Sequence, residues 1–352
     1  MWAMILKEFL ELRRDRRTMA MIVALPLVLL VVFGYAANFR VQDVPTQVVG
    51  PHAEHVAAQL RSPFDVQRVD ASADEQDGRL ALRAQDAGAV VVTSGAAGPA
   101  RVLIDGSNLF SAQAAASAAL AANGALKPDV LFNPDLKTSW VMVPALVGMI
   151  MAFIGTIITA IGLVRERQTG TLEQLAVMPF RASDVIAGKI APYFVLAAVD
   201  MVLVSVLGCL LFGVPFAGNA AVLALGAALF LFTVLGVGVL ISSVSQNQGQ
   251  AMQMALMTLL PQILLSGMIF PLPAMAAGVR WIGYLFPLTY FNKVSSAVML
   301  RDAPLSSLVL PLCVLAGMAL LVFTAAVLRF RRDLAPVAPK AARTAVPAGG
   351  ER

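Results

Sequence analysis

One carboxylate of this 352-residue chain lies deep inside a long apolar run, IAPYFVLAAVDMVLVSVLGCLLF. If Asp200 faced lipid in its charged form, it would cost about 3 kcal/mol or more. Such a group can exchange a proton, bind a cation or contact a cationic substrate, or it can stay protonated or hydrogen-bonded within a helix bundle. A later apolar run contains Gln253 and Gln262 among methionines, which suit either a substrate path or ordinary packing. The residue types leave these alternatives open.

Neither a metal site nor a nucleotide site is indicated by residue spacing. His52 and His55 are the only histidines, and both cysteines lie in apolar runs, so no zinc-ligand set or disulfide framework is expected. The histidines are expected on the surface of a short helix. No G-x-x-x-x-G-K-[ST] motif occurs, since Gly188-Lys189 lacks both the upstream glycine and the following Ser or Thr. We therefore expect no catalytic residue, no metal and no cofactor on this chain.

The most patterned polar stretch is VRERQTGTLEQLAVMPFRASDVIAGK, residues 164–189. Gly170 interrupts the preceding helix, Thr171 can cap a short new helix, and Pro179 ends it. A short helix lying across the ends of two apolar segments could act as a lever for a soluble partner. A solvated connector of mixed charge is the alternative, and the residues themselves do not decide between the two.

The composition of the chain indicates which kind of fold positions the polar residues described above. Hydrophobic residues make up 59% of the chain and charged residues 13%, against about 25% charged in a typical soluble domain. Mean hydropathy is +0.78. These values exclude an ordinary soluble enzyme, a disordered protein and a disulfide-rich secreted domain, and they indicate a helical membrane protein. The net charge of +5 is not gathered into a basic face, so no nucleic-acid partner is expected.

Six apolar runs are long enough to cross a bilayer, which takes about 20 mostly apolar residues. Residues 1–17 are expected to form an interfacial amphipathic helix, with a plain topology-setting flank as the alternative. Residues 271–300 are expected to form an outer re-entrant or interfacial segment, with the aromatics from Phe270 to Phe291 at headgroup level. The predicted spans are residues 18–38, 139–163, 190–212, 220–242, 251–270 and 305–328.

Basic residues mark one side of the predicted membrane. Lys and Arg cluster before the first span, in the 164–189 loop and in the tail 329–352, which places all three and both termini in the cytoplasm. The segment 39–138 then lies outside. Residues 40–138 hold 11 of the 21 carboxylates but only 8 of the 26 Lys and Arg residues, and β-like runs alternate there with Ala-rich helical ones. The predicted fold is an all-α polytopic membrane protein with six transmembrane helices and an inserted small α/β extracytoplasmic domain.

Small residues recur every fourth position in the second predicted span, at Gly148, Ala152, Thr156 and Ala160. This spacing puts them on one helix face and permits close helix contact. The ridge can be a seam within the chain or part of a dimer interface, and spacing does not distinguish the two.

Several motifs, in order, resemble the permease subunits of ABC-2 type exporters, in the drug-efflux-like branch with a large extracytoplasmic loop between spans one and two. The most specific is RERQTGTLEQL at residues 165–175, while DGSN at 105–108 and FNPDL at 132–136 resemble that branch's outer domain. The other matching segments are KEFLELRRDRRTMAMIVALPLVLLVVFGYA, WVMVPALVGMI, GKIAPYF, LFGVPFAGN, LLSGMIFPLPAM and FPLTYF.

The resemblance implies a role for the patterned loop. In this family the loop forms a coupling helix that docks on a separate ABC ATPase subunit, which would carry the ATP and Mg²⁺. Glu166 and Glu173 would pair with basic groups of that partner, and Leu172 and Leu175 would pack into its groove. The implied ATPase-coupling residues are Arg165, Glu166, Gly170, Thr171, Leu172, Glu173 and Leu175.

The resemblance also implies a cellular setting and partners. The chain would be a multi-pass protein of a bacterial inner membrane, in contact with membrane lipids, and would pair with a second copy or a paralogous permease. Its cargo would be hydrophobic or amphipathic. Whether a periplasmic adaptor joins the outer domain is left open.

Two other functions fit parts of the pattern. A proton-coupled secondary transporter would use Asp200, although no inverted repeat is visible in the sequence. A non-transport membrane receptor or scaffold would use its outer domain, although such a protein has no need of a patterned cytoplasmic lever.

Overall fold

We describe the protein from a computed structural model of the full chain. The predicted interfacial helix and the C-terminal tail beyond Leu334 lie outside the described residues, as does nearly all of the first predicted span. The described residues are Ala20, Ala24, Pro26, Leu27, Leu30, Val41 and residues 43–93, 99–169 and 182–334.

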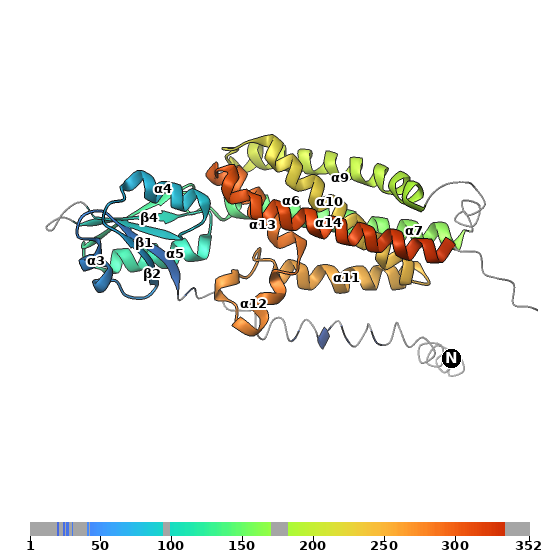
Figure 1. The fold of residues 1–352 in the computed structure, drawn as a ribbon, viewed down its shortest axis with the longest axis horizontal. Helices are drawn as coiled ribbons and strands as arrows, with labels where there is room; N and C mark the ends of the chain where they lie inside the picture. The colour runs from blue at the N-terminus through green and yellow to red at the C-terminus, as the bar shows by residue number, and fades with distance from the viewer. Residues whose placement is uncertain are drawn as a thin grey trace, which may run out of the picture.

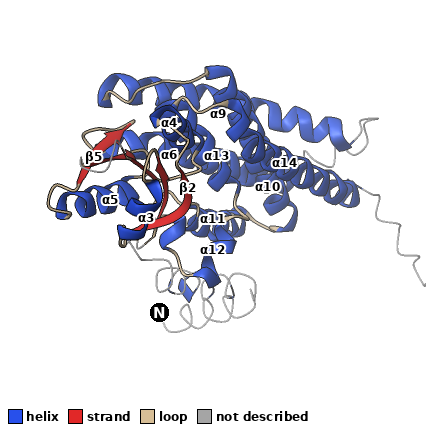
Figure 2. Cartoon of the chain, turned by 60° about the vertical axis from the view of Figure 1, so that its left-hand side comes forward, coloured by secondary structure: helices blue, strands red, loops and turns tan. Residues whose placement is uncertain are grey.

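A five-stranded sheet with three helices forms one end of the molecule (Figure 1, Figure 2). The strand order is β2-β1-β3-β4-β5. All neighbouring pairs run parallel except the antiparallel pair of β3 and β4. The elements are β1 (Val44–Val49), α3 (Ala53–Gln59), β2 (Phe64–Asp70), α4 (Glu75–Ala84), β3 (Ala89–Val92), β4 (Ala100–Asp105), α5 (Leu109–Ala121) and β5 (Leu126–Leu131).

Alternation along the strands divides this domain into two packed faces. In β3, Val91 packs with α3 and α5, whereas the next residue back, Val90, packs against Leu82 of α4. Successive side chains of a strand point to opposite faces, so one short strand serves both layers. Figure 1 accordingly shows α4 on one side of the sheet and α3 and α5 on the other. The small α/β domain expected in this segment is therefore present.

The sequence does not predict β5. Its residues, LKPDVL, combine proline and two charges, which weaken the strand pattern. Because β5 is the edge strand next to β4, Pro128 is tolerated there. Four other strands form where β-like runs are found, at TQVVG, DVQRV, AGAVVV and RVLID.

Helices, several of them long and apolar, form most of the rest of the described chain. Four of them have the length and apolarity to cross a membrane: Thr138–Gln168, Ile190–Phe212, Ala220–Val244 and Leu305–Arg329. The helix in the fifth predicted span is 18 residues long, ends at Leu265 and does not meet that criterion, so the count of six spans stays a prediction. The helices are α6 (Thr138–Phe153), η1 (Ile154–Ile158), α7 (Thr159–Gln168), α9 (Ala182–Phe212), α10 (Ala220–Val244), α11 (Gln248–Leu265), η2 (Leu272–Ala274), α12 (Ala277–Gly283), α13 (Pro287–Ser296), η3 (Ala297–Arg301) and α14 (Leu305–Leu334).

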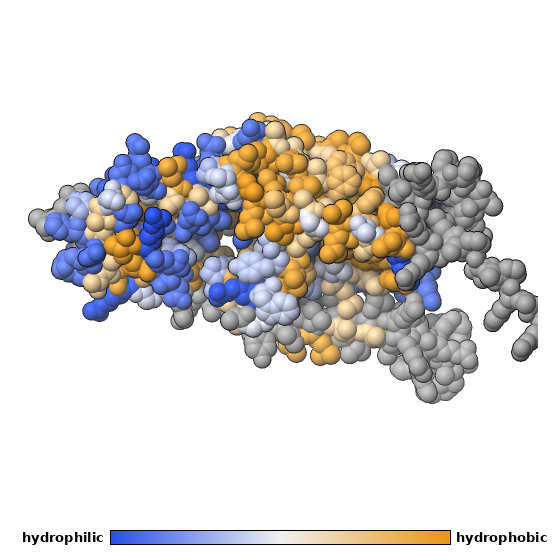
Figure 3. All heavy atoms as spheres, viewed as in Figure 1, coloured by the Kyte–Doolittle hydropathy of each residue, from blue (hydrophilic) through white to orange (hydrophobic). Residues whose placement is uncertain are grey.

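The bundle is hydrophobic both inside and outside. Phe230 of α10 and Phe291 of α13 stack in its core with ring centroids 4.8 Å apart. Figure 3 shows hydrophobic surface over the bundle and hydrophilic surface over the sheet domain. Leu210 of α9 and Leu310 of α14 are more than 70% exposed. A helix that is apolar all round is typical of a membrane span, where lipid covers the outward side chains.

Two of the aromatic residues expected at headgroup level are covered by other parts of this chain and do not face outward. Phe270 and Phe291 are buried inside the chain, at 2% and 0% exposure. Phe291 fills the core because it stands on the inner face of α13, where it stacks on α10. The aromatic spacing alone did not distinguish the inner face of this short helix from the outer one.

Candidate functional site

The end of the bundle away from the sheet domain carries the base of the patterned loop (Figure 1). There, α7 is bonded to the turn between α10 and α11. Arg167 Nη1 donates to the carbonyl oxygens of Ser242 at 3.0 Å and Ser245 at 3.4 Å, and Gln248 donates to Gln168 at 3.1 Å. Three helices that are distant in sequence are thus joined where the loop begins.

Only part of the implied coupling set can be placed. Arg165 is exposed and Glu166 is half-buried, both in the last turn of α7. The remaining members of the set, Gly170, Thr171, Leu172, Glu173 and Leu175, lie outside the described residues, so the coupling assignment stays a prediction.

The three polar residues predicted to lie within the membrane are Asp200, Gln253 and Gln262, and they stand on two helices, α9 and α11. Asp200 lies on α9 between Val199 and Val202, which are 60% and 55% exposed, and its Oδ2 atom is buried without a hydrogen-bond partner in the described chain. Gln262 is buried in α11, and the side-chain oxygen of Gln253 also lacks a partner among the described residues. No hydrogen bond joins the aspartate to either glutamine within those residues.

The small-residue ridge packs inside this chain. Gly148 faces α13, where an added Cβ would come within 2.6 Å of the Phe291 ring. Thr156 donates to the carbonyl of Val234 in α10 at 3.4 Å, and both Ala152 and Ala160 are fully buried. The close approach explains why small side chains occur here, because a larger one would overlap its neighbour.

The histidine pair is exposed on α3. His52 precedes the helix with a positive φ of 66°, and His55 lies 3.0 Å from Gln59. Within the described ranges, no group of three His, Cys, Asp or Glu side chains could hold a metal ion.

A buried ion pair joins the sheet domain to the bundle. Arg301, at the end of η3, lies 3.5 Å from Asp105 at the end of β4, and the two side chains are 2% and 3% exposed. Arg301 also donates to the Ser107 hydroxyl at 3.1 Å. At the rim, Arg83 of α4 lies 4.0 Å from Asp302. Ion pairs, in addition to the covalent chain, therefore connect the sheet domain to the bundle.

The two outer-domain motifs meet at this junction. Asp105 of DGSN accepts the Ser107 amide at 2.9 Å, and Asn108 caps α5. Asn133 of FNPDL, fully buried, donates to the Gly106 carbonyl at 3.4 Å and to the Lys137 carbonyl at 3.1 Å. The motifs thus stabilise the turn that presents Asp105 to the bundle.

The motifs and spacings of the sequence predict no functional role for Arg301 or Lys293. A signal was present, because these two, with Asp302, are the only charged residues between Trp281 and Leu328. Lys293 stands on α13, outside the four long spans, with its ammonium 5.4 Å from the centroid of the Tyr284 ring. Burial, and secondly the nearby charge of Arg301, lower its pKa. Cations on the outer side of the predicted membrane are unusual, because Lys and Arg are concentrated on the cytoplasmic side of membrane proteins.

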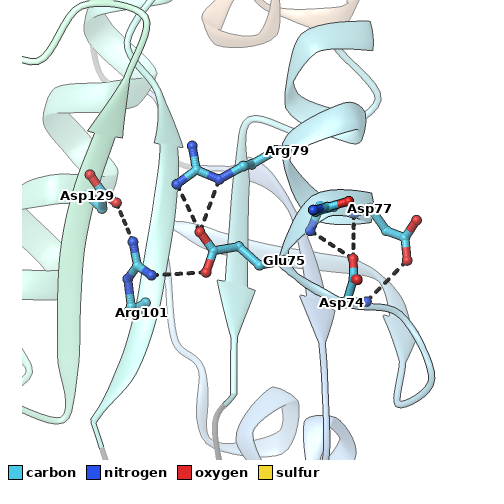
Figure 4. A network of polar contacts seen from close by, with 7 residues as sticks. Asp74, Glu75, Asp77, Arg79, Arg101 and Asp129 are labelled. Carbon is cyan, nitrogen blue, oxygen red and sulfur yellow. Dashed lines mark hydrogen bonds and ion pairs between the residues drawn. The ribbon is translucent and has the colours of Figure 1, made fainter.

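A second arginine network lies on the sheet domain itself (Figure 4). Arg101 of β4 contacts Glu75 at 2.9 Å and Asp129 of β5 at 2.6 Å, and Glu75 also pairs with Arg79 at 2.8 Å. Asp74 and Asp77 form a capping box at the start of α4. The four side chains of the ion-pair network, Glu75, Arg79, Arg101 and Asp129, are between 34% and 43% exposed.

Comparisons with known proteins identify the family of this chain. The chain matches the family of ABC-2 family transporter proteins over residues 16–328. The probable multidrug ABC transporter permease YbhR of Escherichia coli is 27% identical over 337 residues, covering 87% of this chain and 91% of its own. The related permease YbhS is 27% identical over 339 residues, covering 85% and 88%. The E. coli inner membrane transport permease YhhJ is 30% identical over 223 residues, covering 60% and 57%.

The matched region runs from just before the first predicted span to the end of the last one. This region contains the apolar bundle, the inserted sheet domain and the loop segment between α7 and α9. The resemblance found in the motifs is confirmed: this multi-pass membrane protein belongs to the ABC-2 transporter family.

Proposed function

We propose that the chain is the membrane subunit of an ATP-driven exporter that moves a hydrophobic or amphipathic molecule out across a bacterial inner membrane. A separate ABC ATPase would bind the loop after α7 and supply ATP and Mg²⁺. Two permeases, identical or paralogous, would pair with two ATPases. Both termini would be cytoplasmic and the sheet domain extracytoplasmic.

The observation that carries this proposal is the bonded base of the loop. Arg167 ties the end of α7 to the carbonyls of Ser242 and Ser245, and Gln168 accepts a hydrogen bond from Gln248, so a force on the loop would reach α10 and α11 as well. A motor subunit acting on one short segment needs such a connection in order to move several helices together.

One continuous helix extends from that base to the sheet domain. The elements α6, η1 and α7 form a 31-residue helix, which is roughly 46 Å long at about 1.5 Å per residue. Its middle, η1, is a π-helical segment packed on α10 through Gly155 and Thr156. Such segments often occur at functional sites, and this one offers a place where the long helix can bend during alternating access.

Co-purification tests the proposal. The tagged full chain, taken from its native membrane, is expected to bring a P-loop ATPase with it. In vesicles holding both proteins, ATP should drive flux of a fluorescent amphipathic dye, and Leu172→Ala with Glu173→Ala should reduce that flux at least about tenfold, since both residues would contact the partner. A matched exposed substitution, Lys127→Met, should leave flux unchanged.

The buried, unpartnered carboxylate oxygen of Asp200 favours one rival, a proton-coupled carrier. That rival requires flux to continue without the ATPase, to collapse when an ionophore removes the proton gradient, and to be lost in Asp200→Asn. Flux that depends on ATP and survives the ionophore would exclude it. Flux that needs no ATPase and stops when the ionophore is added would contradict the exporter proposal.

A further inference from the structure

A cavity of about 400 Å³ lies between the sheet domain and the adjacent end of the bundle. The sheet domain contributes the turns at 85–88 and 105–111, and the bundle contributes α6, α13 and the segment after α11. Cavities of about 300–1,000 Å³ bind molecules of drug size. This cavity is separate from the base of the coupling loop, which lies at the other end of the bundle (Figure 1).

One face of α13 lines the cavity with polar groups. Thr289, Asn292, Lys293 and Ser296 all contribute, at positions i, i+3, i+4 and i+7 of the helix. Residues at that spacing share a face. The opposite side of the same helix is apolar, where Phe291 enters the bundle core. The helix therefore lies between the apolar core and the cavity, and it turns a polar face toward the cavity.

Lys293 has no direct ionic partner among the carboxylates that line the cavity, Asp86 and Asp105. Lys293 is half-buried, and no carboxylate of the described chain pairs with its ammonium, whose recorded contact is the Tyr284 ring. Asp105 lines the same cavity but is already paired with Arg301, and Asp86 is exposed at the rim. A half-buried cation without a counter-ion favours an anionic ligand, because the ligand restores the solvation that burial removed.

The wall opposite α13 adds to this preference. The first turn of the 13-residue α5 lines the cavity, so the partial positive charge of a helix N-terminus is added to that of Lys293. Ser107 and Asn108 supply further polar groups beside it. Phe110, Met142, Met268 and Leu272 complete the lining with apolar and flexible side chains.

We propose that this cavity binds an amphipathic molecule with an anionic head, a carboxylate or a phosphate, whose charge lies against Lys293 and whose apolar part lies against Phe110, Met142 and Met268. The ligand is either a soluble amphipath or an anionic membrane phospholipid. In the former case the inference rests on the proposed export function and defines the charge of the cargo. The site would hold the cargo on the outer side, next to the sheet domain.

Photolabelling of the full chain in phosphatidylcholine nanodiscs tests the site. Three probes share one diazirine-bearing alkyl tail and differ only in a carboxylate, alcohol or amine head. The carboxylate is expected to label the peptides carrying Met142 and Met268 and to exceed the other two probes roughly tenfold, the usual effect of one charge-assisted hydrogen bond.

Variants at one position sharpen the test. Lys293→Met should reduce carboxylate labelling roughly tenfold, while Lys293→Arg should retain it, because the charge is kept. Lys127→Met, an exposed lysine of β5 that does not line the cavity, is the matched control and should behave as wild type. Equal labelling by all three heads would overturn the proposal without any variant. Unchanged labelling in Lys293→Met would also overturn it.

A diazirine-bearing phosphatidylglycerol distinguishes the two sources. If it labels the cavity and the free carboxylate does not compete with it, the anionic site belongs to a lipid headgroup. If the carboxylate labels and phosphatidylglycerol does not, the occupant is a soluble amphipath. Labelling requires neither ATP nor the ATPase, so its failure would reject the site and leave the permease function standing. If labelling is intact but no ATP-driven flux is found, the export function would be rejected and the binding site would stand.

Discussion

Arg301 and Arg101 pair with carboxylates in opposite surroundings. Arg101 has the shorter contacts, at 2.9 and 2.6 Å, but its side chain is 42% exposed (Figure 4). Arg301 lies 3.5 Å from Asp105, with only 2% of its side chain exposed. Water can replace the partner of an exposed charge, whereas a buried charge that loses its partner stays unsolvated. Burial, more than distance, should therefore decide which pair holds the molecule together.

The largest effect is expected at the buried junction. Arg301→Met leaves the Asp105 carboxylate unpaired at a site that is 3% exposed. Loss of one partner of such a pair costs about 3–5 kcal/mol. The change should appear as a lower thermal midpoint of the detergent-solubilised chain and as faster proteolysis between the sheet domain and the bundle. A midpoint within error of wild type would contradict the comparison.

Removing both charges should cost less than removing one. The double variant Arg301→Met with Asp105→Leu has no orphaned buried charge, and apolar replacements of buried pairs are often near neutral. We expect most of the lost stability to return, measured by the same thermal midpoint. Asp302→Asn serves as control, because that carboxylate is 55% exposed and 4.0 Å from Arg83. If the double variant is as unstable as Arg301→Met, packing rather than charge explains the junction.

Arg167 provides an intermediate case at the other end of the bundle. It is half-buried and donates to the uncharged carbonyls of Ser242 and Ser245. Arg167→Met should cost about 1–2 kcal/mol, since those carbonyls lose a charged donor but can be reached by water. The thermal midpoint measures that cost, and the dye-flux assay should show a larger proportional loss. A variant that loses stability but keeps full ATP-driven flux would argue against a coupling role for this contact.

The smallest effect is expected on the exposed network. Arg101→Met should cost about 1 kcal/mol or less, because Glu75 and Asp129 remain accessible to water. The difference from wild type should shrink further at about 1 M salt, where the Debye length is about 3 Å. The cost of Arg301→Met should hardly change with salt. Thermal midpoints of both variants at low and high salt give the comparison directly, and equal salt sensitivity would break it.

Much of the architecture follows from local patterns. The runs around 140–168 and 220–244 are apolar over the full length of a span, so solvent preference alone makes them long helices. The valine-rich strands around Val48 and Val91 are recognisable from their β-branched residues. The edge strand β5 escaped because its pairing with β4, rather than its own residues, keeps it extended.

The candidate sites divide in the same way. The patterned loop stands out because glycine, threonine and proline punctuate it over a short distance. The junction does not, because Asp105 and Arg301 are 196 positions apart and only folding brings them to 3.5 Å. Lys293 is one of three charged residues in a long apolar stretch, but its lack of a counter-ion depends on segments that only folding brings near it.

The sequence was sufficient to predict the membrane class, the inserted domain, the position of the patterned loop and the family. Each of these is written in composition, in periodicity or in short contiguous motifs, which need no knowledge of distant contacts. Only the tertiary structure decided that the small-residue ridge packs on α10 and α13, that Phe291 enters the core, and that a cavity opens beside Lys293. The physical reason is that burial and charge balance are properties of an environment, and the environment of each residue here is supplied by segments far away along the chain.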